Sequence, residues 1–144
     1  MATQTIQKRP AAYDGTSVLY LDDSYQQQSG RQVRIVGFRE GLSTKLIEEG
    51  VVAQFDRELQ ELPLTDTDYC LDFSGIEWFG VAGIGKMIKF SQSYNRLRGV
   101  QLSVVNMKPE VKEVFEITRL DRIMFQFYAT IDDMINEKRI PPSV

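Results

Sequence analysis

A glycine-rich turn in the middle of the chain carries the residues best suited to bind an anion. Residues 80–86 read G-x-x-x-x-G-K and follow an apolar run at 69–73. Backbone N–H groups at the start of a helix, together with the positive end of its dipole, attract phosphate. Lys86 would add a cationic side chain. The pattern is typical of a phosphate-binding loop.

The residue after this pattern argues against nucleotide hydrolysis. A phosphate-binding loop continues with Ser or Thr, whose hydroxyl ligates magnesium, whereas this chain has Met87. A thioether is a poor ligand for a hard cation. The sequence therefore predicts no hydrolysis, and sensing of a phosphate or nucleotide without chemistry stays open.

The composition removes most catalytic chemistry. The chain contains no histidine, which excludes Ser-His and Cys-His pairs and every imidazole metal site. Acidic pairs such as Asp22-Asp23 and Glu48-Glu49 are adjacent in sequence, so their side chains diverge on a strand or helix. Cys70, the single cysteine, lies in an apolar run and is interpreted as a buried side chain. We expect no catalytic residue, no cofactor and no metal.

Charge and hydropathy limit the partners. The formal net charge of −3 argues against nucleic acid, which requires clustered cationic side chains. No stretch approaches the roughly 20 apolar residues of a membrane span, and the first residues lack the apolar core of a signal peptide. We therefore expect a cytoplasmic protein that does not insert into a membrane.

Two kinds of apolar pattern alternate along the chain. Alternating or continuous apolar residues predict strands at 18–21, 33–38, 69–73, 101–105 and 123–128. Apolar residues at helical spacing predict helices over 44–62 and 81–97, and two more that start at Pro109 and Thr130. The polar segment 22–32 is predicted to be a loop.

The helix boundaries have their own signals. Ser43 or Thr44 is expected to cap the first helix, Gly50 is expected to start or kink it, and Gly99 is expected to close the second. The inward-facing apolar residues of the first helix are expected to be Leu46, Ile47, Val51, Val52, Phe55, Leu59 and Leu62. The inner face of the third is expected to be Val111, Val114, Phe115 and Thr118.

This order of elements predicts an α/β domain. Strands that alternate with helices give a mixed, mainly parallel sheet covered by about four helices, with an antiparallel pair at the N-terminus. The run at 69–73 is apolar enough to be the central strand. The predicted organisation is an N-terminal tail over 1–16, one domain over 17–138 and a C-terminal tail over 139–144.

Several segments, taken in order, resemble the STAS domain, the family of anti-sigma factor antagonists and of the cytoplasmic domains of sulfate transporters. The similarity extends over about 33–135. It is carried by the phrases Leu71–Ile76, Gly83–Gly85, Gly99–Asn106 and Lys108–Val111, with Leu120-Asp121. The resemblance implies a small non-enzymatic regulator that works by binding another protein, typically an anti-sigma factor with kinase activity.

The same resemblance exposes a departure at the turn before the second helix. The family usually has Asp-Ser-Ser-Gly or Asp-Ser-Thr-Gly there, and phosphorylation of the first hydroxyl breaks the complex. The matching residues here are Gly80-Val81-Ala82-Gly83. Val81 and Ala82 have no hydroxyl, so phosphate cannot attach at these degenerate phosphoacceptor positions. We therefore interpret the chain as a constitutive binder or scaffold.

Partner-binding residues are expected around this turn. Trp78 and Phe79 are consecutive, so one of them should point outward and could anchor a partner. Phe90 lies between the inner and outer faces of the second helix and is a further candidate. The full predicted set is Trp78, Phe79, Gly80, Val81, Ala82, Gly83, Lys86 and Phe90.

The resemblance leaves the identity of the partner open. It allows an anti-sigma factor or kinase-like regulator, another STAS-type subunit, or a second copy of the chain. A STAS subunit of a transport complex is an alternative role. At each position of the turn a plain packing role is also open, since Val81 and Ala82 could simply lie against Trp78 or Phe79.

Overall fold

The computed structural model describes residues 13–117, 119 and 124–141. Five strands form one sheet: β1 (Leu19–Gln26), β2 (Gln32–Phe38), β3 (Asp68–Asp72), β4 (Leu102–Val105) and β5 (Phe125–Tyr128). They lie in the order β1-β2-β3-β4-β5, with β1 and β2 antiparallel and the other pairs parallel. The predicted mixed sheet and its central strand are confirmed.

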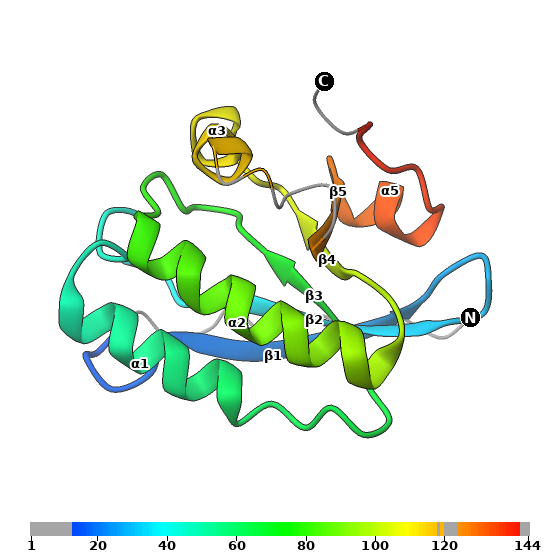
Figure 1. Cartoon of the computed structure of the whole chain (residues 1–144), viewed down its shortest axis with the longest axis horizontal. Coiled ribbons are helices and arrows are strands. Elements are labelled where there is room, and N and C mark those ends of the chain that lie inside the picture. The colour runs from blue at the N-terminus through cyan, green and yellow to red at the C-terminus, as the bar shows by residue number, and fades with distance from the viewer. Residues whose placement is uncertain (1–12, 118, 120–123, 142–144) are drawn as a thin grey trace.

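Helices cover both faces of this sheet unequally. The described helices are α1 (Glu49–Gln60), α2 (Val81–Arg98), α3 (Pro109–Ile117) and α5 (Ile131–Ile135). Figure 1 shows α1 and α2 side by side in front of the sheet. Buried residues of α1, α2 and α3 share one core with the sheet, whereas Met134 of α5 packs with Ile35 and Cys70 in a second, smaller cluster. Alternate strand residues therefore face two different cores.

Aromatic rings fill the centre of the larger core. Phe73 and Phe79 meet edge to face with centroids 5.1 Å apart, and Phe79 stacks on Phe115 at 5.8 Å. Phe55 of α1 also meets Phe79 edge to face at 5.7 Å. One ring from the turn before α2 thus contacts the residue that directly follows β3 and rings of α1 and α3, and these contacts hold that turn in place.

Strand β1 extends beyond its predicted end. The sequence predicts a loop over 22–32, but β1 continues to Gln26, with a register shift between Leu21 and Ser24. β1 is an edge strand, where charged residues and bulges are common because one side faces solvent. The polar composition that suggests a loop is therefore compatible with a strand at this edge.

Helix α1 starts later than predicted. Its N-cap is Glu48, and no side chain caps it, so the proposed Ser43 or Thr44 cap is wrong. Residues 43–47 form turns instead. The carbonyl of Ser43 accepts hydrogen bonds from the backbone N–H groups of Glu77 and Trp78, each at 3.0 Å. This segment is held against the turn before α2 rather than within the helix.

Other boundary signals are confirmed. Gly99 adopts the left-handed conformation (φ 74°) at the end of α2, and its N–H donates to the carbonyl of Asn95. The Thr130 hydroxyl accepts a hydrogen bond from the N–H of Asp133 at 3.0 Å and so caps α5. Thr118, the residues Leu120 and Asp121, and the start of the strand predicted at 123–128 lie outside the described residues.

Chain segments near both predicted domain limits lie on the domain. The N–H of Tyr13 donates to the carbonyl of Glu40 at 2.6 Å, and that of Ile140 donates to the carbonyl of Phe127 at 2.8 Å. Residues 1–12 and 142–144 of the predicted tails lie outside the described residues. Among the helices of the described part, none is long and apolar enough to cross a bilayer.

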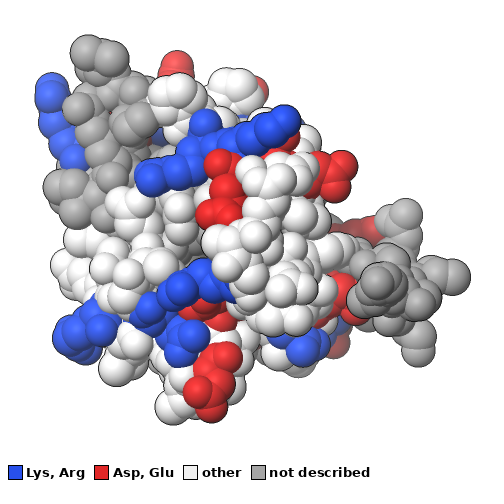
Figure 2. Space-filling view, turned by 90° about the vertical axis from the view of Figure 1, so that its right-hand side faces the viewer, with Lys and Arg blue, Asp and Glu red and all other residues white. Residues whose placement is uncertain are grey.

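The buried carboxylate of Asp68 connects three elements at the end of the sheet opposite the turn before α2. Asp68 is 3% exposed. Its oxygens lie 2.7 Å from Nε of Arg31, in the β1–β2 turn, and 2.7 Å from Nε of Arg98, at the end of α2. Arg98 also donates to the carbonyl of Thr65. Figure 2 views this end, where basic side chains lie next to acidic ones and form no continuous cationic surface among the described residues of that face.

Candidate binding surface at the start of helix α2

The start of α2 has a glycine as its N-cap. Gly80 is the N-cap with an extended conformation, and its carbonyl accepts the N–H of Ile84 at 3.1 Å. Among the described residues no side chain caps this helix, and its first turn contains no acid. The turn therefore presents neither a hydroxyl nor a carboxylate at the positions where the resemblance to the STAS domain implies them.

Three large apolar side chains are exposed around this turn. Ile47 is 60% exposed, Trp78 is 59% exposed and Val81 is 75% exposed. The Ser43 carbonyl holds the 43–47 segment against Trp78, and a Cβ placed on Gly80 would lie 3.4 Å from Cγ2 of Ile47. The chain segments that carry these three exposed side chains are therefore adjacent, and we call the three residues together the apolar patch (Ile47, Trp78 and Val81).

The two consecutive aromatic residues point in opposite directions, as predicted. Trp78 lies at the surface, whereas Phe79 is only 4% exposed and packs among the core rings. A buried ring cannot contact a partner, so Phe79 belongs to the support of the apolar patch. Ala82 is exposed next to Val81.

Gly83 is explained by its contact with Phe79. A Cβ added at Gly83 would lie 3.0 Å from Cζ and 3.1 Å from Cε1 of the Phe79 ring. Real Cβ atoms rarely approach this closely, and the ring is held by Phe55, Phe73 and Phe115. Glycine lets the first turn of α2 lie directly on that ring.

Gly83→Ala is expected to be less stable than Gly85→Ala by about 2 kcal/mol. Both substitutions remove the helix penalty of glycine, about 1 kcal/mol. Only Gly83→Ala forces Phe79 to move, since nothing lies within 4 Å of a Cβ at Gly85. Urea unfolding of the two variants measures the difference, and equal stabilities would contradict the proposed contact.

Two other predicted site residues are not free at the surface. Phe90 is 2% exposed and lies in the core beside Tyr94, with ring centroids 6.1 Å apart. Its position between the two faces of α2 therefore belongs to the buried face of the helix. Lys86 reaches across to α1, where its Nζ lies 3.7 Å from Oδ2 of Asp56. Its charge is therefore partly balanced away from the helix start.

Sequence reasoning missed Ile47. The apolar spacing of 44–62 assigns it to the inner face of a helix, but α1 begins only at Glu49 and Ile47 lies in the preceding turn. The available signal was Gly50, which favours a later helix start.

The described residues offer few groups that could bind a metal or act as a nucleophile. Within the described residues no three Asp, Glu or Cys side chains are grouped to hold a metal. Cys70 is fully buried, and burial, with a smaller effect of Asp72, raises the pKa of its thiol well above its usual range. A neutral, inaccessible thiol is a packing residue. What this surface offers is shape and apolar area.

Comparisons with known proteins agree with this architecture. The family model for the STAS domain matches residues 45–134, more than half of the chain. No curated protein matches the chain. The fold is similar to an anti-sigma-factor antagonist (STAS) domain protein from Planctomyces limnophilus, with TM-score 0.57 and 16% identity over 78% of this chain and 93% of that one.

Two further solved structures share the fold. The protein TM1081, solved by NMR, gives a TM-score of 0.56 at 19% identity over 93% of this chain and 95% of that one. The murine anion transporter Slc26a9 in its inward-facing state gives 0.57 at 16% identity, over 82% of this chain and 22% of the transporter. With the matched family model and the sheet order, these findings lead to one conclusion: the chain belongs to the STAS domain family.

Proposed function

We propose that this STAS domain is a protein-interaction module whose partner docks on the apolar patch and is not released by phosphorylation of the adjacent turn. The observation that carries the proposal is Val81, 75% exposed in the first turn of α2. The family resemblance expects a phosphoacceptor hydroxyl at this turn, and neither Val81 nor Ala82 supplies one. The partner class that this resemblance supports is an anti-sigma factor or kinase-like regulator, or another STAS-type subunit.

The physical basis is the kind of surface that the turn presents. Phosphorylation would add nearly two negative charges to a contact and disfavour an apolar interface. Without it, exposed apolar side chains around an aromatic anchor stay available for burial. Aromatic residues at the centre of an interface carry much of the binding energy. We propose on this basis a constitutive binder or scaffold that acts in the cytoplasm and has no catalytic activity.

A phosphate sensor has less support. Lys86 would have to leave Asp56, 3.7 Å away, to reach an anion at the helix start. The resemblance to an anion transporter supports a transport subunit no more than an antagonist, since the two fold similarities have the same TM-score.

Val81→Glu is expected to weaken partner capture at least tenfold, because a charge would have to be buried against an apolar partner surface. The domain should stay folded, since an acid in the first turn interacts favourably with the helix dipole. The measurement is affinity capture from the native cell extract with quantitative mass spectrometry, comparing wild type and variant.

Leu97→Glu is the matched control. Leu97 is 61% exposed on the same helix but at its other end, so this variant should retain the partners that Val81→Glu loses. Equal retention by both variants would place the binding surface elsewhere. Release of the partner upon stoichiometric phosphorylation of any other Ser or Thr would also contradict the proposal.

A further inference from the structure

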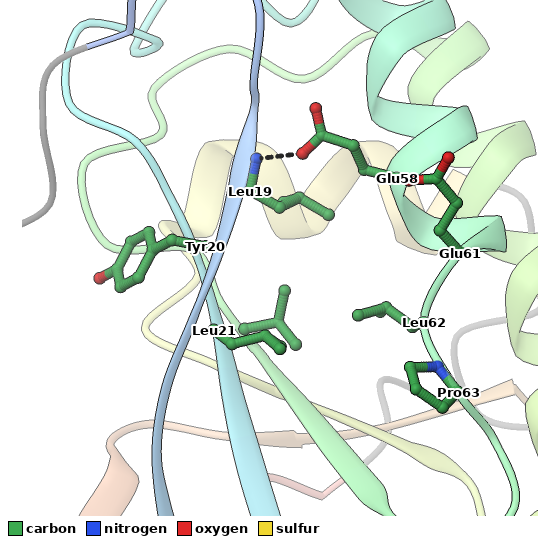
Figure 3. Close-up of a pocket in the computed structure, with 8 residues that line it drawn as sticks. Leu19, Tyr20, Leu21, Glu58, Glu61, Leu62 and Pro63 are labelled. Carbon is green, nitrogen blue, oxygen red and sulfur yellow. Dashed lines mark hydrogen bonds between the residues drawn. The ribbon is translucent and has the colours of Figure 1, made fainter.

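A pocket lies between edge strand β1 and the segment that follows α1. Its volume is about 220 Å³. Figure 3 shows Leu21 of β1 facing Leu62 and Pro63 across it. The apolar walls come from Leu19, Leu21, Val36, Leu62 and Pro63. Leu21 is 48% exposed, so part of this apolar surface is open to solvent.

Two carboxylates lie at the same pocket, and no basic residue lines it. Glu58 accepts hydrogen bonds from the backbone N–H groups of Val18 at 2.9 Å and Leu19 at 2.7 Å, and from the Gln54 side chain at 2.7 Å. All three donors are uncharged. Glu61 is exposed, and neither glutamate has a Lys or Arg ion pair within the described residues.

The end of α1 adds to this negative charge. Glu61 is the C-cap of α1, where the carbonyl ends of the helix already carry a partial negative charge. The basic residue of the last turn, Arg57, does not line the pocket, and its guanidinium donates to the side chain of Gln54. The pocket therefore combines an apolar interior with two carboxylates that form no ion pair with a described Lys or Arg.

The pocket size indicates what could fill it. A cavity of about 150 Å³ accommodates a benzene molecule, whereas small-molecule sites usually occupy about 300–1,000 Å³. At about 220 Å³ the pocket suits one long side chain. Lysine and arginine combine an aliphatic stem with a charged end and place each in the matching environment.

The edge of β1 is closed to a docking strand on both sides of the pocket. The N–H of Leu19 donates a hydrogen bond to Glu58, and the carbonyl of Leu19 accepts one from the Ser17 hydroxyl at 3.2 Å. Beyond Leu21 the register shifts, and the N–H of Asp23 donates to the side chain of Asp22. An added strand needs an uninterrupted row of free backbone groups. Insertion of a side chain therefore fits this edge better than strand pairing.

We infer that this pocket is a second docking site, which binds a lysine or arginine side chain presented by a partner protein. Its aliphatic stem lies against Leu21 and Leu62, and its charged end meets Glu61 and the outer side of Glu58. The site is at the C-terminal end of α1, whereas the apolar patch is at the N-terminal end. The helix of 12 residues separates them by about 18 Å, so two partner segments can bind at once and the inference does not depend on the proposed function.

The test is an NMR titration of the ¹⁵N-labelled chain with N-acetyl-arginine amide, compared with N-acetyl-citrulline amide. The two probes share the aliphatic stem and differ in charge. We expect saturable shifts of the Leu19, Leu21 and Leu62 amides by the arginine probe, with a dissociation constant of about 1 mM. The citrulline probe should bind at least about fivefold more weakly.

Charge reversal supplies the protein control. Glu61→Lys should weaken arginine binding at least about fivefold and should fold normally, since lysine is favourable at a helix C-terminus. Glu77→Lys makes the same change of net charge beside the apolar patch and should leave binding unchanged. Equal binding of the two probes, equal loss in both variants, arginine shifts that centre elsewhere, or concentration-dependent shifts showing that a second copy fills the pocket would each overturn the inference.

Discussion

Phe79→Ala is expected to lower the free energy of unfolding by about 3–5 kcal/mol, the cost of removing a buried phenylalanine and leaving a cavity. Phe79 is 4% exposed and contacts the ring of Phe73, directly after β3, and rings of α1 and α3. Urea unfolding followed by circular dichroism measures this loss, and a change below about 1 kcal/mol would contradict the described core.

The neighbouring Trp78→Ala variant separates stability from binding. Trp78 is 59% exposed, so its removal should change the free energy of unfolding by less than about 1 kcal/mol. Because Trp78 is the aromatic anchor of the apolar patch, the variant should capture the partner at least tenfold more weakly. Loss of stability together with retained capture would show that Trp78 is a packing residue.

Asp68→Asn is expected to lower the free energy of unfolding by about 2–3 kcal/mol, because Arg31 and Arg98 would lose their shared carboxylate. This loss of free energy should be smaller than the loss seen when a fully buried ion pair is broken by removing one partner. The Arg31 and Arg98 side chains are 37% and 20% exposed, so both guanidinium groups can be partly hydrated. Thermal or urea unfolding measures the change.

Asp66→Asn is the control for this variant. Asp66 is exposed in the loop that precedes β3, and its substitution should change the free energy of unfolding by less than about 0.5 kcal/mol. Equal effects of the two variants would mean that the buried ion pairs do not hold the β1–β2 turn and the end of α2 to the sheet.

The sequence predicts the interior of this fold better than its edge. The apolar run at 69–73 corresponds to β3, and the apolar pattern that starts at Val81 corresponds to α2. Both elements contribute buried residues to the core, so hydrophobic periodicity is the dominant signal there. The second half of β1 is stabilised by pairing with β2 at the edge, which leaves its polar side chains in solvent. A polar sequence carries no such signal, because a loop and an edge strand look alike.

Only part of the apolar patch can be predicted from the sequence. Strand alternation is enough to expect one of Trp78 and Phe79 to face outward, and the turn sequence is enough to expect a missing phosphoacceptor. The exposure of Ile47 depends on a backbone contact between Ser43 and Trp78, which lie far apart in sequence. Phe90 is buried in the core that α2 shares with the sheet and α1. Both outcomes depend on tertiary contacts that local spacing does not encode.

The central claim is that a partner docks on Ile47, Trp78 and Val81 at the uncapped start of α2. Hydrogen–deuterium exchange of the chain, free and bound to the partner captured by wild type but not by Val81→Glu, tests it most directly. The account predicts slower exchange in the bound state at residues 43–48 and 77–84, with unchanged exchange at the start of β3 around Asp68. Protection confined to the α5 face of the sheet, with unchanged exchange at the start of α2, would contradict it.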